Sequence, residues 1–406
     1  MTDARGFHVA SVDINDFCQK CLANTAIEKR ENRVPAPAHI TVNSGVMGQT
    51  DYWLRSGSCS KVEMVRAEGS THVQAPSGVP EFVFDYAPLF YLHPAERYRP
   101  SSISEFLVHT RPQIEFKDVS NPSPAPTLAH LDNLNDLGEK GGENIYLTSF
   151  DDVTQNPPWL GGVPTTSNGS ESEETGAIII VEKEKGVVDV FYFLFFAFNW
   201  GGIVLNHQLG NHVGDWEHVM IRFIDSKPRY AWLSQHATGE AYAFQALPKP
   251  ASGNRPLLYI ANGTHAIYPQ QGATDHTLPN HNSSVPLLLV DHCAEGDVYD
   301  PLTSSYLYQY TPHSPSLSST TPAHSPATFH PLHPTTLSPG WLAFKGRWGD
   351  QQYPATDQRQ KGGLLGFRRF GDGPTGPAFK ELGRAEVWPA SVARGQRVRM
   401  RVRGRG

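Results

Sequence analysis

The segment Val187-Val-Asp-Val-Phe-Tyr-Phe-Leu-Phe-Phe-Ala-Phe198 carries the clearest structural signal in this chain of 406 residues. It is almost continuously apolar and rich in β-branched and aromatic residues, a pattern typical of a strand covered on both faces. Ala177-Ile-Ile-Ile-Val181 has the same character, whereas 213–223 and 256–261 alternate more. The 36 glycines and 33 prolines suit turns better than helix interiors. We therefore expect a mainly β fold, an antiparallel β-sandwich-like domain with long loops and a few short helices.

Composition divides the chain into three regions. Residues 1–76 are polar and irregular, with a weak strand signal at 38–42. A main domain is expected over 77–390, and its segment 311–339 is dominated by Ser, Thr, Pro and His. Because that segment has few apolar residues to offset the entropy of ordering, it is predicted to be a flexible loop. Residues 391–406 form an Arg/Gly-rich tail with six arginines and no acid, which we interpret as a solvated end.

Local signals in the first half of the main domain predict one strand and two helices. Residues 81–92 are rich in aromatic side chains and are predicted to be a strand interrupted at Pro88. Ser102-Ile-Ser-Glu105 matches a capping box, so a short helix is expected as far as His109. Leucines recur every three residues from Leu128 to Leu137, which predicts a second helix ended by Gly138.

Charge and hydropathy exclude some classes of function. The net charge of −6 argues against a nucleic-acid-binding protein. No apolar stretch reaches the ~20 residues of a transmembrane helix, so no transmembrane segment is expected. The N-terminal residues show no apolar signal-peptide core, which predicts a cytoplasmic protein for the sequence as given. A vacuolar or secretory route stays open if translation starts elsewhere. The pair Cys18 and Cys21 has no second pair to complete a zinc site and is interpreted as incidental.

The segment Asn211-His-Val-Gly-Asp-Trp-Glu-His218 carries the strongest candidate site. On a strand, Asp215 and Glu217 share one face and Trp216 and His218 share the other. Two carboxylates so close on one face repel unless a cation, a basic side chain or a proton compensates them. Such a pair can bind a hard metal ion or divide general-acid and general-base roles. The structural alternative is that Asp215 is a turn residue and that Glu217 pairs with an arginine.

Histidines at the ends of later apolar runs extend this candidate site, because binding groups on β scaffolds gather where strands end. We predict the following catalytic candidates: Asp215, Glu217, His218 and His265. We predict a second group of binding candidates: His212, Trp216, His236, Asn262 and His276. The cofactor is left open, with a divalent metal ion as one candidate.

An ordered series of motifs resembles the fungal vacuolar protein sorting-associated protein 62 family over roughly residues 80–388. The segments that carry the resemblance are Phe84-Asp-Tyr-Ala-Pro-Leu89, Ala197-Phe-Asn-Trp-Gly-Gly202, Leu209-Gly-Asn-His-Val-Gly-Asp-Trp-Glu-His218, Ala261-Asn-Gly-Thr-His-Ala266 and Gly346-Arg-Trp-Gly-Asp350. The resemblance implies a role in vacuolar protein sorting, as a trafficking or binding protein whose partner is the trafficking machinery.

A second hypothesis is a fungal natural-product enzyme, a cyclase or another enzyme that transforms a small-molecule substrate in an Asp/Glu/His pocket. The two hypotheses differ in what they require of the fold. An enzyme needs Asp215, Glu217 and the histidines to line one concave pocket, whereas a scaffold can leave them dispersed.

Overall fold

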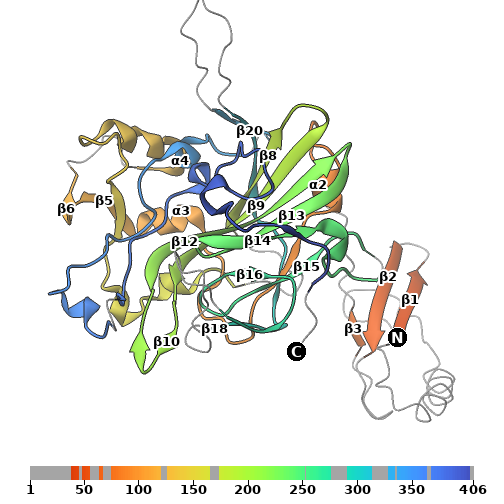
Figure 1. The fold of residues 1–406 in the computed structure, drawn as a ribbon, viewed down its shortest axis with the longest axis horizontal. Coiled ribbons are helices and arrows are strands. Elements are labelled where there is room, and N and C mark those ends of the chain that lie inside the picture. Colours follow the sequence, from red (N-terminus) through yellow and green to blue (C-terminus); the bar gives the residue numbers. More distant parts are fainter. Residues whose placement is uncertain are drawn as a thin grey trace, which may run out of the picture. The chain divides into compact units, whose positions relative to one another are not determined.

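The fold is that of a computed structural model (Figure 1). It describes residues 38–44, 48–54, 64–66, 75–119, 126–164, 173–251, 253–275, 290–312, 328–333, 336–363 and 367–402. The chain divides into two compact units, Met1–His72 and Val73–Gly406. In the first unit the described residues form an antiparallel sheet of β1 (Ala38–Ser44), β2 (Gly48–Leu54) and β3 (Met64–Arg66). The predicted strand at 38–42 is therefore confirmed.

An eight-stranded sheet in the order β21-β20-β8-β9-β12-β13-β14-β22 forms the centre of the second unit. Its strands are β8 (Gly176–Glu182), β9 (Val187–Asn199), β12 (His212–Ile224), β13 (Lys227–Gln235), β14 (Thr238–Ala243), β20 (Ser305–Thr311), β21 (Thr328–Pro331) and β22 (Val398–Arg399). Neighbouring strands are antiparallel except for two parallel pairs, β20 with β8 and β14 with β22. The apolar runs predicted as buried strands thus lie at the middle of this sheet.

A second, four-stranded sheet covers one face of the central sheet. It has the order β16-β15-β4-β19 and consists of β4 (Leu89–Tyr91), β15 (Leu257–Ile260), β16 (Ile267–Tyr268) and β19 (Val298–Tyr299). Tyr192 and Ile221 of the central sheet pack with Phe90 and Leu258 of the second sheet in one buried cluster. The mainly β, sandwich-like prediction is confirmed, although β4 and β15 run parallel rather than antiparallel.

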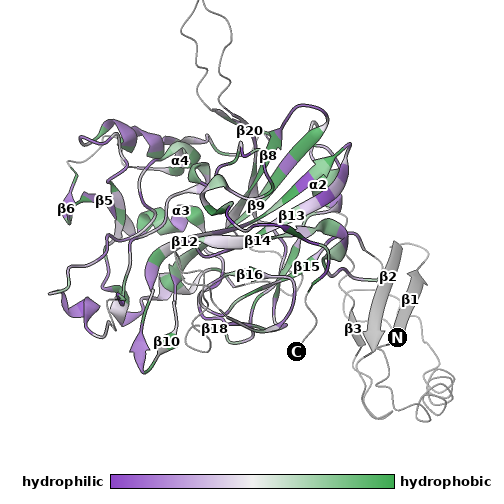
Figure 2. Cartoon of the chain, viewed as in Figure 1, coloured by the Kyte–Doolittle hydropathy of each residue, from purple (hydrophilic) through white to green (hydrophobic). Residues whose placement is uncertain are grey.

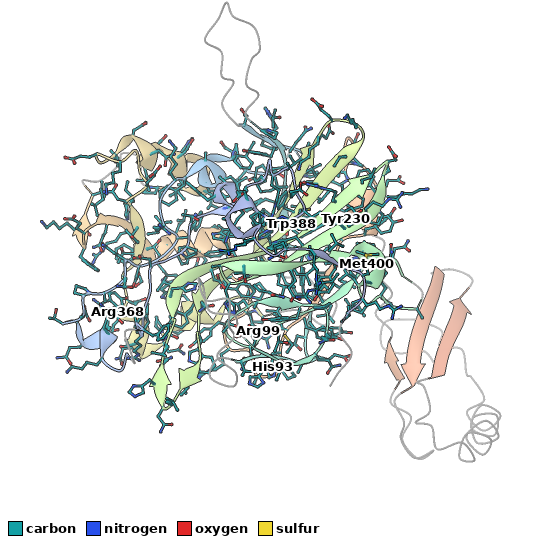
Figure 3. All side chains as sticks on the ribbon, in the orientation of Figure 1. His93, Arg99, Tyr230, Arg368, Trp388 and Met400 are labelled. Atoms are coloured by element: carbon teal, nitrogen blue, oxygen red, sulfur yellow. The ribbon has the colours of Figure 1, made fainter. Side chains whose placement is uncertain are left out.

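Helices and loops cover the opposite face of the central sheet. They include α3 (Ile103–Val108), the 3-10 helix η1 (Leu128–Asp136) and α4 (Gly340–Ala343). Trp216 of β12 stacks on Trp341 at a centroid distance of 5.7 Å and meets Trp348 edge-on at 5.4 Å. Tyr230 and Trp388 pack against the margin of this core (Figure 3). Buried apolar clusters therefore lie on both faces of the central sheet, and the ribbon of its middle strands is coloured largely as hydrophobic in Figure 2. This explains why β9 is apolar apart from Asp189 and Asn199.

Smaller elements surround these layers. One small sheet consists of β5 (Thr110–Ile114), β6 (Lys117–Asp118) and β7 (Tyr146–Ser149). Two strand pairs are β10 (Ile203–Val204) with β11 (His207–Gln208), and β17 (Gly272–Asp275) with β18 (Val290–Cys293). The remaining 3-10 turns are η2 (Val153–Gln155), η3 (Pro158–Gly161), η4 (Phe244–Ala246), η5 (Gln358–Gln360), η6 (Pro377–Phe379) and η7 (Ala390–Val392). Among the residues described, no helix has the length and apolar content needed to span a bilayer.

Two predicted helices are confirmed. The Ser102 side chain accepts a hydrogen bond from the Glu105 amide at the start of α3, as a capping box requires. The leucines at 128, 131 and 134 are buried, and η1 is kinked at His130, where φ is −135°. After the kink, the three-residue turn of a 3-10 helix places Leu131 and Leu134 on a single face.

Three sequence predictions need correction. Residues 82–85 form the helix α2 (Phe82–Asp85) rather than a strand, because one helical turn after Pro80 buries Val83 and Phe84 in the core between the sheets. Within the predicted loop 311–339, β21 pairs with β20, and Phe329 packs on Tyr310. The tail is not wholly a solvated end, because β22 adds to the edge of the central sheet and Arg399 bonds to Glu240.

A substitution at Gly214 tests how tightly the loop at Trp348 packs on β12. Its φ is +69°, and a Cβ atom at this position would lie 2.0 Å from the carbonyl oxygen of Trp348. We expect Gly214→Ala to lower the free energy of unfolding by about 3 kcal/mol or more, because backbone strain and overlap add. Gly202→Ala is the matched control, since φ there is +99° but no atom lies within 4 Å; a loss of about 1 kcal/mol is expected. Equal urea midpoints for the two variants would contradict this packing.

Candidate functional site

The central sheet opens between β12 and β13. The two strands pair regularly near Val219 and Leu233, but beyond this point toward the start of β12 the register ends. The side chain of Ser234 replaces the missing strand partner here, because its Oγ accepts a hydrogen bond of 2.8 Å from the backbone amide of His218. A buried amide that has lost its strand partner needs such an acceptor. The opening is therefore built into the sheet without an unsatisfied backbone group at His218.

The Glu217 carboxyl group lies in this opening and bridges the separated strands. Ser234 donates its hydroxyl hydrogen to Oε2 of Glu217, and the backbone amide of His236 donates to Oε1 over 3.2 Å. His236 begins the turn between β13 and β14 with φ of +58°, a conformation that a non-glycine residue adopts at some cost. The turn geometry thus fixes both the amide that holds Glu217 and the imidazole beside it.

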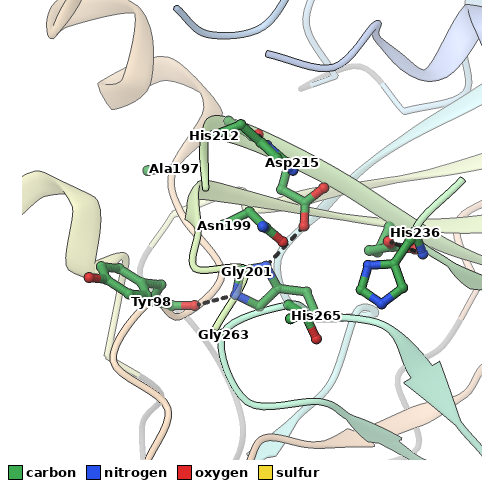
Figure 4. Close-up of polar contacts among 12 residues, drawn as sticks. Tyr98, Ala197, Asn199, Gly201, His212, Asp215, His236, Gly263 and His265 are labelled. Atoms are coloured by element: carbon green, nitrogen blue, oxygen red, sulfur yellow. Dashed lines mark hydrogen bonds and ion pairs between the residues drawn. The ribbon is translucent and has the colours of Figure 1, made fainter. Parts of the chain in front are cut away.

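A cavity of about 200 Å³ lies at this opening (Figure 4). Its lining is mainly polar and comes from three separate parts of the chain. The lining residues are Asn199, His212, Asp215, Trp216, Glu217, His236, Ala237, Asp372, Pro374 and Lys380. The cavity combines two acids of β12 with imidazole and ammonium groups, so it can bind a small polar ligand or exchange protons with one.

Asp215 is paired with His265 at the base of the site. Its Oδ2 lies 2.9 Å from Nδ1 of His265, and Nε2 of His265 donates to the carbonyl oxygen of Tyr98 over 3.1 Å (Figure 4). The imidazole is buried and stacks on Phe196 at 3.7 Å. Burial lowers the pKa of His265, but the bond to Asp215 and the charge of Glu96 outweigh it and raise the pKa. We infer an aspartate–imidazolium pair.

Glu217 is the acid whose protonation changes near neutral pH. Burial and the negative charge of Asp215 raise its pKa from 4.5 to about 7. Asp215 behaves in the opposite way: burial raises its pKa, but the hydrogen bond from His265 and the charge of that imidazolium lower it overall. The two acids of β12 thus differ in protonation state, which is the arrangement that general acid–base chemistry uses.

His236 lies across the cavity from the Asp215–His265 pair and has its own acidic partner (Figure 4). Its Nε2 lies 2.9 Å from Oδ2 of Asp291. Asp291 accepts two further hydrogen bonds of 2.6 Å, from the hydroxyl groups of Thr264 and Tyr268. Burial lowers the pKa of His236, but the charge of Asp291 and the bond to it raise the pKa overall. The site therefore holds a second aspartate–histidine pair, with Asp291 fixed from three sides.

His212 and Lys380 complete the polar lining. His212 donates from Nδ1 to the carbonyl oxygen of Gly214 over 2.7 Å. Burial is the main cause that lowers its pKa, so we infer a neutral imidazole whose Nε2 is an acceptor. Lys380 lies near enough to Asp215 and Glu217 to lower the pKa of both. The cavity thus contains a neutral base, a cation and a protonatable acid.

The structure brings some of the predicted site residues together and separates others. Asp215, Glu217, His212, Trp216 and His236 line the cavity, and His265 lies directly behind Asp215. His218 and Asn262 do not line the cavity, and His276 lies outside the described residues. His218 lies on the other face of β12. Its ring stacks on that of Phe193 with 5.0 Å between the centroids, and its Nε2 lies 3.2 Å from a guanidinium nitrogen of Arg384. Strand alternation explains this placement.

Several residues of the site had no assigned role from the sequence. Asp291 and Ser234 are among them, because their contacts to His236 and Glu217 depend on the fold. Asn199, Asp372 and Lys380 had no signal beyond their polarity, and the last two lie more than 150 positions after Asp215. The paired carboxylates are compensated by an imidazolium at Asp215 and by a proton at Glu217. Within the described part of the chain, no group of three or more His, Cys, Asp or Glu side chains has the geometry of a metal site.

The fold and site define a mainly β protein with a polar, acid- and histidine-lined pocket in the middle of its central sheet. Residues 186–278 match the family model described as vacuolar protein sorting-associated protein 62. The putative vacuolar protein sorting-associated protein TDA6 of Saccharomyces cerevisiae is 33% identical over 343 residues, 78% of this chain and 69% of that protein. Vacuolar protein sorting-associated protein 62 of the same yeast is 32% identical over 347 residues, 79% and 70% of the two chains. No solved structure matches.

This chain therefore belongs to the vacuolar protein sorting-associated protein 62 family. The segment that matches the family model contains β12, β13 and β14, together with His265. It thus includes the two acids that β12 contributes to the pocket and the imidazoles that flank them, but not Asp372.

The raised pKa of Glu217 predicts a pH-dependent stability. Between pH 4.5 and about 7 the folded protein holds a proton that the unfolded chain releases, so this contribution is complete below pH 4.5 and is lost as the pH rises through 7. The loss is roughly 3 kcal/mol, since one pKa unit corresponds to about 1.4 kcal/mol. The Glu217→Gln variant has no titrating group at this position. Its free energy of unfolding should therefore fall less than that of the wild type between pH 5 and pH 8.

Urea denaturation at the two pH values measures this difference. Glu184→Gln is the control, because Glu184 is exposed in a turn outside the site, and it should follow the wild type. Parallel pH profiles for the wild type and Glu217→Gln would show that Glu217 does not hold a proton in the folded protein.

Proposed function

We propose that this chain acts in the sorting of proteins to the vacuole. One observation carries the proposal: two Saccharomyces cerevisiae proteins named for vacuolar protein sorting align with more than three quarters of the chain at 32–33% identity. The function implies a vacuolar route and contact with the trafficking machinery. The pocket supports a role in which a small polar ligand is bound, because the family-model match includes its β12 acids, Asp215 and Glu217, and His236.

Complementation in yeast tests the sorting role. In Saccharomyces cerevisiae lacking both named relatives, we expect a soluble vacuolar hydrolase to appear in the culture medium, and this chain to restore its retention. Immunoblotting of medium and cell fractions measures the partition of the hydrolase. The proposal fails if both relatives are removed and the hydrolase still reaches the vacuole, or if the expressed and folded chain leaves the missorting unchanged.

The second candidate is an enzyme that transfers protons to or from a small-molecule substrate. The observation that favours it is the position of Glu217, whose pKa of about 7 lets it donate or accept a proton, beside the neutral His212 and the Asp291-paired His236. Groups whose pKa values are moved apart within one pocket are typical of acid and base pairs. Natural-product transformation, including cyclisation, is one chemistry that such a pair serves.

Glu217→Gln separates the two candidates. The amide keeps the size of the side chain but cannot exchange the proton, so an enzyme should lose about 100-fold or more of its rate. An untargeted metabolite comparison should then group a strain expressing Glu217→Gln with the deletion strain, and a strain expressing the exposed-site variant Glu184→Gln with the wild type. If Glu217→Gln restores both hydrolase retention and the wild-type metabolites, proton exchange at Glu217 is not part of the function.

A further inference from the structure

The hairpin β10–β11 projects from the end of the central sheet, between β9 and β12 (Figure 1). Val204 pairs with His207, and the two residues between them have positive φ, +48° at Leu205 and +65° at Asn206. This is the geometry of a type I′ turn, which favours Asn and Gly. A leucine at the first position is unusual, because its Cβ disfavours a positive φ. The sequence therefore keeps a large apolar side chain at the tip against the local backbone preference.

Among the residues whose side chains the structure describes, three large apolar side chains are exposed in and beside this hairpin. Ile203 and Leu205 of the hairpin are 62% and 66% exposed, and Phe367 is 47% exposed. The Phe367 segment adjoins the hairpin through several contacts. The backbone amide of Gly210 donates to the carbonyl oxygen of Arg368 over 3.0 Å, and Nε of Arg369 donates to the side chain of Gln208 over 3.2 Å. We call Ile203, Leu205, Phe367 and their basic neighbours the hairpin surface.

The hairpin surface is basic in a chain whose net charge is −6. Segments 200–211 and 358–371 contain Arg359, Lys361, Arg368 and Arg369 and no Asp or Glu. Arg359 forms an ion pair with Asp357, while Lys361 and Arg368 are exposed, the latter at the periphery of the molecule in Figure 3. Exposed apolar tips with cations on the adjoining segment match the interface of an anionic membrane, where the tips enter the headgroup layer and the cations meet lipid phosphates.

We propose that the hairpin surface docks on an anionic membrane surface, with Ile203, Leu205 and Phe367 inserted among the lipid headgroups. This goes beyond the proposed sorting role and does not depend on the pocket. The form of the surface favours a membrane over a protein partner, because a stable protein interface needs roughly 800 Å² on each side and a broad apolar centre. In the described part of this surface, two exposed apolar side chains lie on a two-residue-turn hairpin and one on the segment beside it.

Vesicle flotation tests the docking. The purified chain should float with phosphatidylcholine vesicles that contain phosphatidylserine and remain unbound with pure phosphatidylcholine. The double variant Ile203→Asp with Leu205→Asp should lower partitioning by about tenfold or more, since it replaces the inserted groups with anions. Lys361→Gln with Arg368→Gln should lower it by about fivefold for each cation removed. Because these residues are exposed, circular dichroism should show unchanged folding.

The hairpin β5–β6 provides the matched control. Phe116 also lies at a turn with φ of +62° and is 39% exposed, but its neighbours Glu115 and Asp118 outnumber the one cation of the turn, Lys117. Phe116→Asp should leave vesicle binding unchanged. The proposal is overturned if the wild type does not float with anionic vesicles or if Ile203→Asp with Leu205→Asp floats equally well. It is also overturned if light scattering shows a dimer that this variant dissociates and vesicles do not compete, since the tip would then be a protein contact.

Discussion

The hydrogen bonds that Ser234 and Glu217 provide allow a polar pocket to open inside a buried sheet. Separating two central strands exposes backbone amides that have neither a strand partner nor free access to water, and each such group costs free energy. The Ser234 hydroxyl accepts from the His218 amide, and the Glu217 carboxyl accepts from the His236 amide. Glu217, which satisfies the His236 amide, is therefore also a side chain that lines the cavity. Its structural and chemical roles cannot be varied independently.

The pKa values of the acids in the pocket follow from this arrangement. A carboxyl group buried between strands and beside a second acid is stabilised in its neutral form, which is why the pKa of Glu217 is raised to about 7. The pKa of Asp215 is instead lowered, mainly by the hydrogen bond from His265. Asp291 has an imidazole within hydrogen-bonding distance too, that of His236. Both histidines occupy left-handed backbone conformations, with φ of +59° and +58°. Strained backbone at two residues of one pocket is consistent with a site whose geometry is maintained for a purpose other than stability.

Much of the central architecture could be predicted from the sequence, because it depends on local patterns. Alternation along β12 places Asp215 and Glu217 on one face and Trp216 and His218 on the other, and the contacts of these side chains agree. The same alternation separates His218 from the other catalytic candidates. The sequence alone could not decide whether a cation, a basic side chain or a proton compensates the paired acids. The answer depends on His265, which lies fifty positions after Asp215.

The remainder of the site depends on contacts between distant segments. Lys380 and Asp372 reach the cavity only because the chain after β21 folds back over the central sheet, and no local spacing marks them. Residues 82–85 were also misjudged, because an aromatic-rich run suits a strand and a buried helical turn equally well. Pairing of β22 with β14 is likewise a long-range contact that an arginine-rich composition does not suggest.

The pocket and the hairpin surface share one structural junction. Asn199 pairs with His212 at the ends of β9 and β12, and both residues line the cavity. From there the chain continues directly into the hairpin, whose neck is closed by the side chains of two asparagines: Asn199 donates to the carbonyl oxygen of Gly210, and Asn211 accepts from the amide of Gly201, each over 3.0 Å. These hydrogen bonds of ordinary length satisfy backbone groups where the sheet ends and the hairpin begins. The pocket and the hairpin surface are thus built on the ends of the same two strands, and the residues that join them are fixed by side-chain contacts rather than by the strand ladder.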